Sequence, residues 1–108
     1  MLSCARYRIM STTLAALQRA THQAVLEGPG TVDGSIRQQV ARATPPPDLA
    51  VLVQKIRDHA YRVTDADVDA LRAHYSEDQL FEVIVAAAFG AAEHRLQRAL
   101  AVVEDACG

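Results

Sequence analysis

The spacing of apolar residues predicts a chain built from helices. Apolar positions recur every three or four residues and predict helices at 11–27, 35–43, 48–63 and 76–104, with a short helix that begins at Thr64. No segment alternates apolar and polar residues over the length of a strand. At 108 residues the chain is long enough for one modest core. We therefore expect an all-α fold in a single domain.

The helix at 76–104 is the longest and the most apolar. Ser76 and Gln79 have the spacing of a capping box, which pairs each side chain with the other residue's backbone N–H and marks the first turn. From Leu80 to Ala92 nearly every position is apolar except Glu82. One apolar stripe continues to the end of the helix, through Phe81, Val85, Ala88, Ala92, Leu96, Ala99 and Val103. We expect this long central apolar helix to organise the fold.

Such a helix exceeds what a chain of this size can cover. A helix that is apolar on most sides needs neighbours on most sides, and the other predicted helices are few and short. We therefore expect a homo-oligomer (dimer, trimer or hexamer) in which another subunit covers part of this helix. Ala86 and Gly90, four residues apart, would allow the partner's backbone to approach closely.

Proline and glycine mark the boundaries of the segments. Gly28-Pro29-Gly30 ends the first helix, and Pro45-Pro46-Pro47 forms an extended spacer. Residues 1–10 are expected to be a disordered extension, because Met10 resembles a natural start. Residues 11–44 then form an N-terminal helical arm, and residues 48–108 form the helical core.

Composition and charge exclude several classes of function. The formal net charge is -2 and the pI is near 6.0, whereas nucleic-acid binding needs a concentrated basic face. No apolar run approaches the ~20 residues that cross a bilayer, so no membrane association and a cytoplasmic location are expected. Cys4 and Cys107 are expected to be free thiols in a reducing cytosol, and a terminal disulfide is the alternative. No cysteine or histidine spacing is typical of a metal site, and no cofactor motif is present.

Part of the second half of the chain resembles the alkylhydroperoxidase D-like (AhpD-like), or carboxymuconolactone decarboxylase, family. The resembling segments are 64–71 (TDADVDAL), 75–82 (YSEDQLFE) and 86–92 (AAAFGAA), followed by Arg95 and Leu96. The resemblance covers about a third of the chain and implies an AhpD-like helical bundle that assembles through these helices. Peroxidase members of the family carry Cys-x-x-Cys followed by His. Counted back from Ser76, those positions fall near His59, Arg62 and Ala66, so no catalytic residue is carried over.

These observations favour a self-associating accessory or interaction protein without the thiol peroxidase motif. One alternative is a cofactor-free acid/base enzyme of the decarboxylase type, and another is residual hydroperoxide reductase activity at Cys4 or Cys107.

Two residues are candidates for the acid/base role. His59 borders an apolar stripe and could exchange a proton, although a boundary histidine bound to a carbonyl group or water is the simpler interpretation. Glu82 is the single acid in the apolar run. Burial would raise its pKa and let it hold a proton, whereas a solvent-accessible Glu82 would be an ordinary carboxylate. His22, His74 and His94 are expected to be isolated surface histidines.

Overall fold

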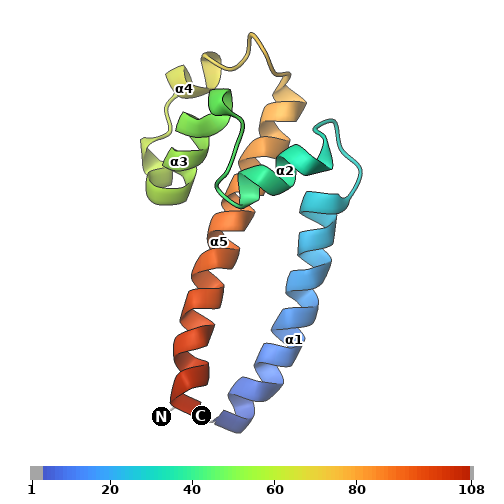
Figure 1. Cartoon of the computed structure of the whole chain (residues 1–108), viewed down its shortest axis with the longest axis vertical. Coiled ribbons are helices and arrows are strands. Elements are labelled where there is room, and N and C mark those ends of the chain that lie inside the picture. Colours follow the sequence, from blue (N-terminus) through green and yellow to red (C-terminus); the bar gives the residue numbers. More distant parts are fainter. Residues whose placement is uncertain (1–3, 108) are drawn as a thin grey trace.

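The computed structural model describes residues 4–107, and every element in this range is helical. The expected all-α class is confirmed (Figure 1). The α-helices are α1 (Cys4–His22), α2 (Gly34–Ala41), α3 (Ala50–His59), α4 (Asp65–Asp69) and α5 (Glu77–Cys107). A π-helical turn (Gln23–Glu27) follows α1, and short 3-10 turns (Pro47–Leu49 and Ala60–Arg62) flank α3. None of the described helices is long and apolar enough to span a membrane.

A capping box is present at the start of both α4 and α5. At the start of α5, the Gln79 N–H donates to Ser76 Oγ (3.2 Å), and the Ser76 N–H donates to Gln79 Oε1 (2.9 Å). At the start of α4, Thr64 and Asp67 make the same reciprocal pair. These bonds satisfy backbone donors that the first turn of a helix leaves without an internal partner. These two helices therefore begin where their local sequence predicts.

The core lies between the first half of α5 and the short helices. α2 and α3 pack on this half, as Figure 1 shows, and α1 runs beside the second half. The α5 residues that become buried are Leu80, Val83, Ala86, Ala87, Gly90 and Ala91. Leu49 and Leu52 from the chain around α3, and Val40 from α2, complete the most enclosed layer. The apolar part of α5 is thus covered on two sides by its own chain.

α2, and not a partner subunit, makes the close approach at Ala86 and Gly90. A Cβ atom at Gly90 would collide with the backbone carbonyl group of Ala41 at the end of α2. Ala86 is fully buried in the same layer. The expectation that these small residues admit a partner's backbone is therefore wrong. They let α2 cross α5 at short range.

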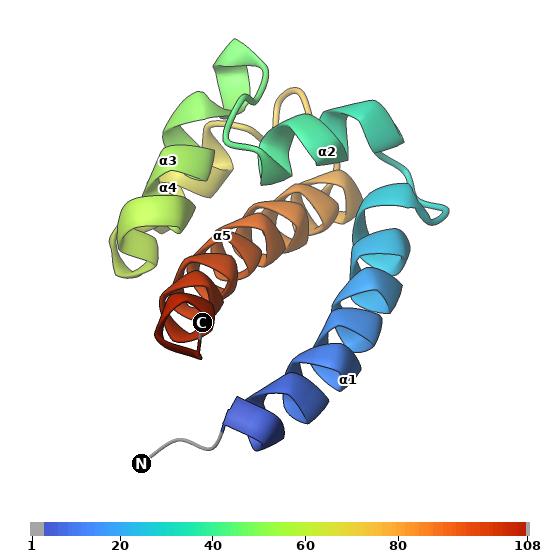
Figure 2. The ribbon, with the colours of Figure 1, turned by 60° about the horizontal axis from the view of Figure 1, so that its bottom comes forward.

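The first helix begins earlier than expected. Residues 4–10 belong to α1 and are not a disordered extension, whereas residues 1–3 lie outside the described range. α1 runs antiparallel to α5, so its first turn lies beside the last turn of α5 (Figures 1 and 2). Cys4 and Cys107 meet there in a disulfide, with their Cα atoms 5.7 Å apart. The expectation of free thiols is therefore wrong.

Candidate functional site

One face of α5 carries an apolar stripe that lies outside the buried core. The stripe consists of Phe81, Val85, Ala88, Ala92, Leu96, Ala99 and Val103. None of the seven is buried, and the side chain of Phe81 is 67% exposed. The buried residues of α5 lie on the other sides of the helix, against α2 and α3. The stripe is a surface of the monomer, because the buried core does not include it.

The spacing of the stripe matches a nearly straight helix. Its six steps advance 22 positions from Phe81 to Val103. This average of about 3.67 residues per step is the period of an 11-residue repeat, which lies close to the ~3.6 residues per turn of an α-helix and implies only a slight right-handed supercoil. At about 1.5 Å per residue the stripe is about 33 Å long. A second helix could follow it over this whole length.

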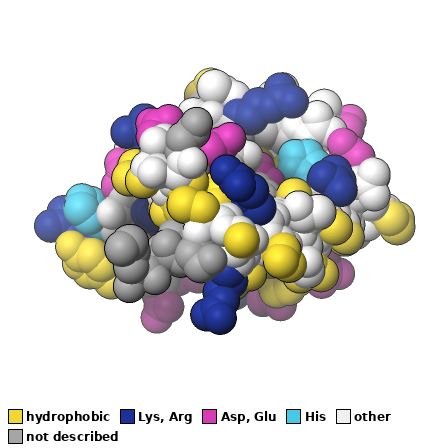
Figure 3. All heavy atoms as spheres, turned by 90° about the horizontal axis from the view of Figure 1, so that it is seen from below, with side chains coloured by type: hydrophobic (Ala, Val, Ile, Leu, Met, Phe, Trp, Pro, Cys, Tyr) yellow, Lys and Arg dark blue, Asp and Glu magenta, His cyan; other side chains and the backbone are white. Residues whose placement is uncertain are grey.

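An apolar groove of about 450 Å³ adjoins the end of the stripe, between α1 and α5. Val103 belongs to both the stripe and the groove, and Leu100 lies beside it. The α1 wall is formed largely by Tyr7, Ile9, Met10, Leu14 and Leu17. Seen from below, hydrophobic side chains reach the surface between positively charged ones (Figure 3). We call the stripe and the groove together the open face.

Glu82 lies on α5 beside the apolar stripe, and its side chain binds the loop between α1 and α2. Its carboxylate accepts hydrogen bonds from the backbone N–H groups of Thr31 and Val32 (2.9 Å each) and from the Thr31 hydroxyl. Gly30 permits this approach, because a Cβ atom there would collide with the carboxylate. The loop that connects α1 to α2 is therefore tied to the first turns of α5.

These hydrogen bonds determine the ionisation of Glu82. Donation from the Thr31 hydroxyl, then from the two backbone N–H groups, with the nearby positive charge of Arg37, lowers the pKa of Glu82 from its ordinary value of 4.5. The alternative of a raised pKa does not hold, because the half-buried carboxylate has donors that stabilise its charged form. At neutral pH Glu82 is an anionic anchor for the loop.

Arg37 is the buried partner of the same loop and was not identified from the sequence. The residue is 5% exposed, and its guanidinium donates to the carbonyl oxygens of Val32 (3.1 Å), Val25 (2.9 Å) and Gly28. Val25 lies in the π-helical turn, and Gly28 and Val32 lie in the loop that follows it. The guanidinium therefore satisfies carbonyl groups that the end of a helix leaves without partners.

Removing the charge of Glu82 should weaken the fold in a pH-dependent way. Glu82→Gln is expected to lower the free energy of unfolding by about 1–2 kcal/mol at pH 7. Because the folded pKa lies below 4.5, this contribution is present above that pH and is lost as the pH falls through the folded value. Urea unfolding at pH 7, 5 and 3 should therefore show the two proteins converging at low pH. The control Glu77→Gln alters an exposed carboxylate, and an equal loss in this control would contradict the assignment.

His59 lies apart from this anchor. It is exposed at the end of α3, where its ring contacts the ring of Tyr61 edge to face (5.7 Å between centroids). In the described part of the chain, His59 and Glu82 share no hydrogen bond or ion pair. Nothing in these contacts prepares the two residues for a common reaction, and their joint catalytic role stays a prediction.

The structure instead brings together His22 and Glu93, which no sequence pattern pairs. His22 Nδ1 lies 3.5 Å from a carboxylate oxygen of Glu93, and Gln18 donates to the same oxygen (3.2 Å). They border a cavity of about 370 Å³ between α1 and α5. His22 is therefore not an isolated surface histidine. No local signal predicts this contact, because the residues are 71 positions apart and meet only through the antiparallel arrangement of α1 and α5.

Comparisons with protein-family models, with curated proteins and with solved structures each found no match to this chain. Among residues 4–107, no group of three or more His, Cys, Asp or Glu side chains is arranged to hold a metal ion.

Proposed function

We propose that this chain is a self-associating helical protein of AhpD-like character, without the thiol peroxidase motif, that acts as an accessory or interaction protein. The observation that carries the proposal is the apolar stripe of α5, whose seven residues are all exposed or half-buried and remain outside the core. Contiguous apolar surface of this kind is typical of interaction sites. The AhpD-like character rests on the resemblance of residues 64–96.

The occupant we propose for the open face is a second copy of the chain. Positions along the stripe are symmetric about Ala92, with steps of four, three and four residues in either direction. An antiparallel copy of α5 related by a two-fold axis at Ala92 therefore presents the same stripe in return. Such an interface is isologous and closes after two subunits.

Two kinds of pair in this register place a large residue opposite a small one. Leu96 lies opposite the partner's Ala88, and Val85 lies opposite the partner's Ala99. Alternation of this kind lets facing helices interdigitate without voids. Ala92 meets the partner's Ala92 at the axis, where short side chains permit close approach of the two helices. The order of residues along the stripe thus favours the antiparallel dimer over a parallel one.

Phe81 is the anchor of the proposed dimer. The register places the partner's Phe81 opposite Val103, which lines the groove between α1 and α5. The groove is apolar and large enough for an aromatic ring. Two-fold symmetry fills both grooves at once. Aromatic residues that enter pockets are the usual hot spots of protein interfaces.

Truncation of Phe81 should weaken the dimer strongly. Each Phe81→Ala substitution is expected to cost about 2 kcal/mol of association free energy, and the dimer contains two, so the dissociation constant should rise about 1000-fold. Sedimentation velocity over a concentration series would measure this change.

The matched control is Val102→Ala. Val102 is 70% exposed on α5 but lies outside the stripe, so its truncation should leave the dissociation constant within about threefold. Equal effects of the two substitutions, or no effect of Phe81→Ala, would refute the proposed register.

The enzymatic alternatives have a direct assay. If the chain were a hydroperoxide reductase, it would consume hydroperoxide with dithiothreitol as reductant, and the double substitution Cys4→Ser and Cys107→Ser would abolish that consumption. If it were an acid/base enzyme that uses the predicted pair, decarboxylase-type activity would fall with His59→Gln and with Glu82→Gln. Activity that survives these substitutions would remove the corresponding alternative.

A further inference from the structure

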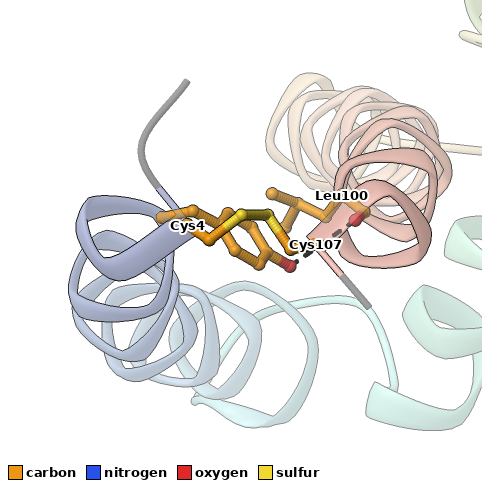
Figure 4. Close-up of a disulfide and its surroundings, with 4 residues drawn as sticks. Cys4, Leu100 and Cys107 are labelled. Carbon is orange, nitrogen blue, oxygen red and sulfur yellow. Dashed lines mark hydrogen bonds between the residues drawn. A yellow bond between two sulfur atoms is a disulfide. The ribbon is translucent and has the colours of Figure 1, made fainter. Parts of the chain in front are cut away.

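The disulfide closes the end of the antiparallel pair of helices that forms the groove. Cys4 is the first described residue of α1 and Cys107 is the last residue of α5, so the bond links the two ends of the chain. Figure 4 shows it bridging the two helices, next to the carbonyl group of Leu100. Both cysteines are half-buried, which leaves the bond at the surface of the molecule.

α1 lies at the surface of the fold, and its most enclosed residues are only half-buried. The helix contributes no buried residue to the core. Near its start, the Tyr7 hydroxyl donates to the Leu100 carbonyl oxygen at 3.5 Å, which is the outer limit of a hydrogen bond. The bonds of Gln18 and His22 to Glu93 lie near the other end. Most of the stability of a helix in a protein comes from packing of one face on its neighbours, so α1 depends on its attachment to α5.

The same helix forms one wall of the groove. Tyr7, Met10 and Leu14 line the cavity from α1, opposite Leu100 and Val103 of α5. The groove exists only while the first half of α1 stays beside the last turns of α5. The disulfide is the covalent tie at that end.

We propose that the Cys4–Cys107 disulfide is a redox switch that controls self-association by holding or releasing the α1 wall of the groove. This inference rests on the proposed function, because it concerns regulation of the same open face. In the oxidised chain the groove is intact and accepts the partner's Phe81. In the reduced chain α1 separates from α5 and the groove is lost.

The reductant is a low-molecular-weight thiol of the glutathione class. One thiolate attacks a sulfur of the disulfide, forms a mixed disulfide with that cysteine and releases the other cysteine as a thiolate, which takes up a proton. A second thiolate attacks the mixed disulfide at the reductant's sulfur. The products are two cysteine thiols and the oxidised reductant, so two electrons pass from two thiols to the protein disulfide. Oxidation reverses the change when an oxidised thiol of the same class is in excess.

Hydrogen exchange and sedimentation test the two halves of the inference separately. The oxidised chain is compared with the chain in dithiothreitol and with the double variant Cys4→Ser and Cys107→Ser. Reduction is expected to speed amide exchange in residues 4–16 by at least about 100-fold, while residues 80–91 keep their protection. The dissociation constant of the dimer is expected to rise at least about tenfold. The double variant should match the reduced chain in both measurements, without added reductant.

Each of the other possible results contradicts one specific part of the proposal. Protection of residues 4–16 that survives reduction overturns the release of α1. Loss of protection throughout residues 80–91 also overturns the switch, because the disulfide would then hold the whole fold. Rapid exchange in α1 with an unchanged dimer overturns the control of association but leaves the proposed function intact. A chain that is monomeric even when oxidised overturns the proposed function itself.

Discussion

Arg37→Met is expected to lower the free energy of unfolding by about 4 kcal/mol. The guanidinium is buried and donates to three backbone carbonyl oxygens, those of Val25, Gly28 and Val32. Methionine fills much of the same volume but donates no hydrogen bond, so all three acceptors lose a partner. Each unsatisfied buried acceptor costs about 1–3 kcal/mol, and water entry at the surface-exposed loop relieves part of the sum.

Urea unfolding followed by circular dichroism measures this loss. The control Arg98→Met replaces an exposed arginine on α5 and should stay within about 0.5 kcal/mol of the original chain. If Arg37→Met behaves like this control, the loop is not held by the guanidinium. A variant that combines Arg37→Met and Glu82→Gln should lower the free energy of unfolding by less than the sum of the two single effects, because both residues hold the same loop.

Gly90→Val should cost about 3 kcal/mol of unfolding free energy. Gly90 is buried in the middle of α5, and even a Cβ atom there would collide with the backbone of Ala41. The obstacle is the carbonyl end of α2 and not a flexible side chain, so α2 would have to move as a unit. Valine has a better helix propensity than glycine, but that gain is below about 1 kcal/mol and is smaller than the steric cost.

The matched substitution is Ala101→Val, at an exposed position of the same helix. It should change the free energy of unfolding by less than about 1 kcal/mol. A stable Gly90→Val variant, with an unfolding midpoint equal to that of Ala101→Val, would mean that α2 does not cross α5 at Gly90.

Local sequence predicts the helices well where the signal lies within one turn. The capping boxes at Ser76 and Thr64 need only residues three positions apart, and both are present. Asp48 shows the limit of such a signal. An Asp at the start of the predicted helix 48–63 has the residue type of an N-cap, but it lies inside a 3-10 turn after the prolines and accepts a hydrogen bond from the Tyr75 hydroxyl (2.7 Å).

The features that hold the tertiary structure were not predictable in this way. The Cys4–Cys107 pair spans 103 positions and forms because α1 folds back along α5. The acceptors of Arg37 are backbone carbonyl groups, which carry no residue-type signal. Glu82 was identified as unusual, but the donors that lower its pKa come from a loop about 50 positions earlier.

The apolar stripe of α5 was predictable as a pattern but not as a surface. Periodicity placed Phe81, Val85 and the following positions on one face. Whether that face lies in the core or in solvent depends on where α2 and α3 pack, and they pack on the neighbouring sides. The excess of apolar residues over available cover is the reason to propose a partner, although Ala86 and Gly90 are not part of that surface.

The molecular mass of the oxidised chain in solution tests the central claim most directly. Sedimentation equilibrium at about 10 µM chain, without reductant, should give twice the chain mass of 11.7 kDa. Phe81→Ala at the same concentration should give the mass of one chain. A mass of 11.7 kDa for the unmodified oxidised chain at concentrations up to about 100 µM would contradict the account, because the open face would then have no second copy to cover it.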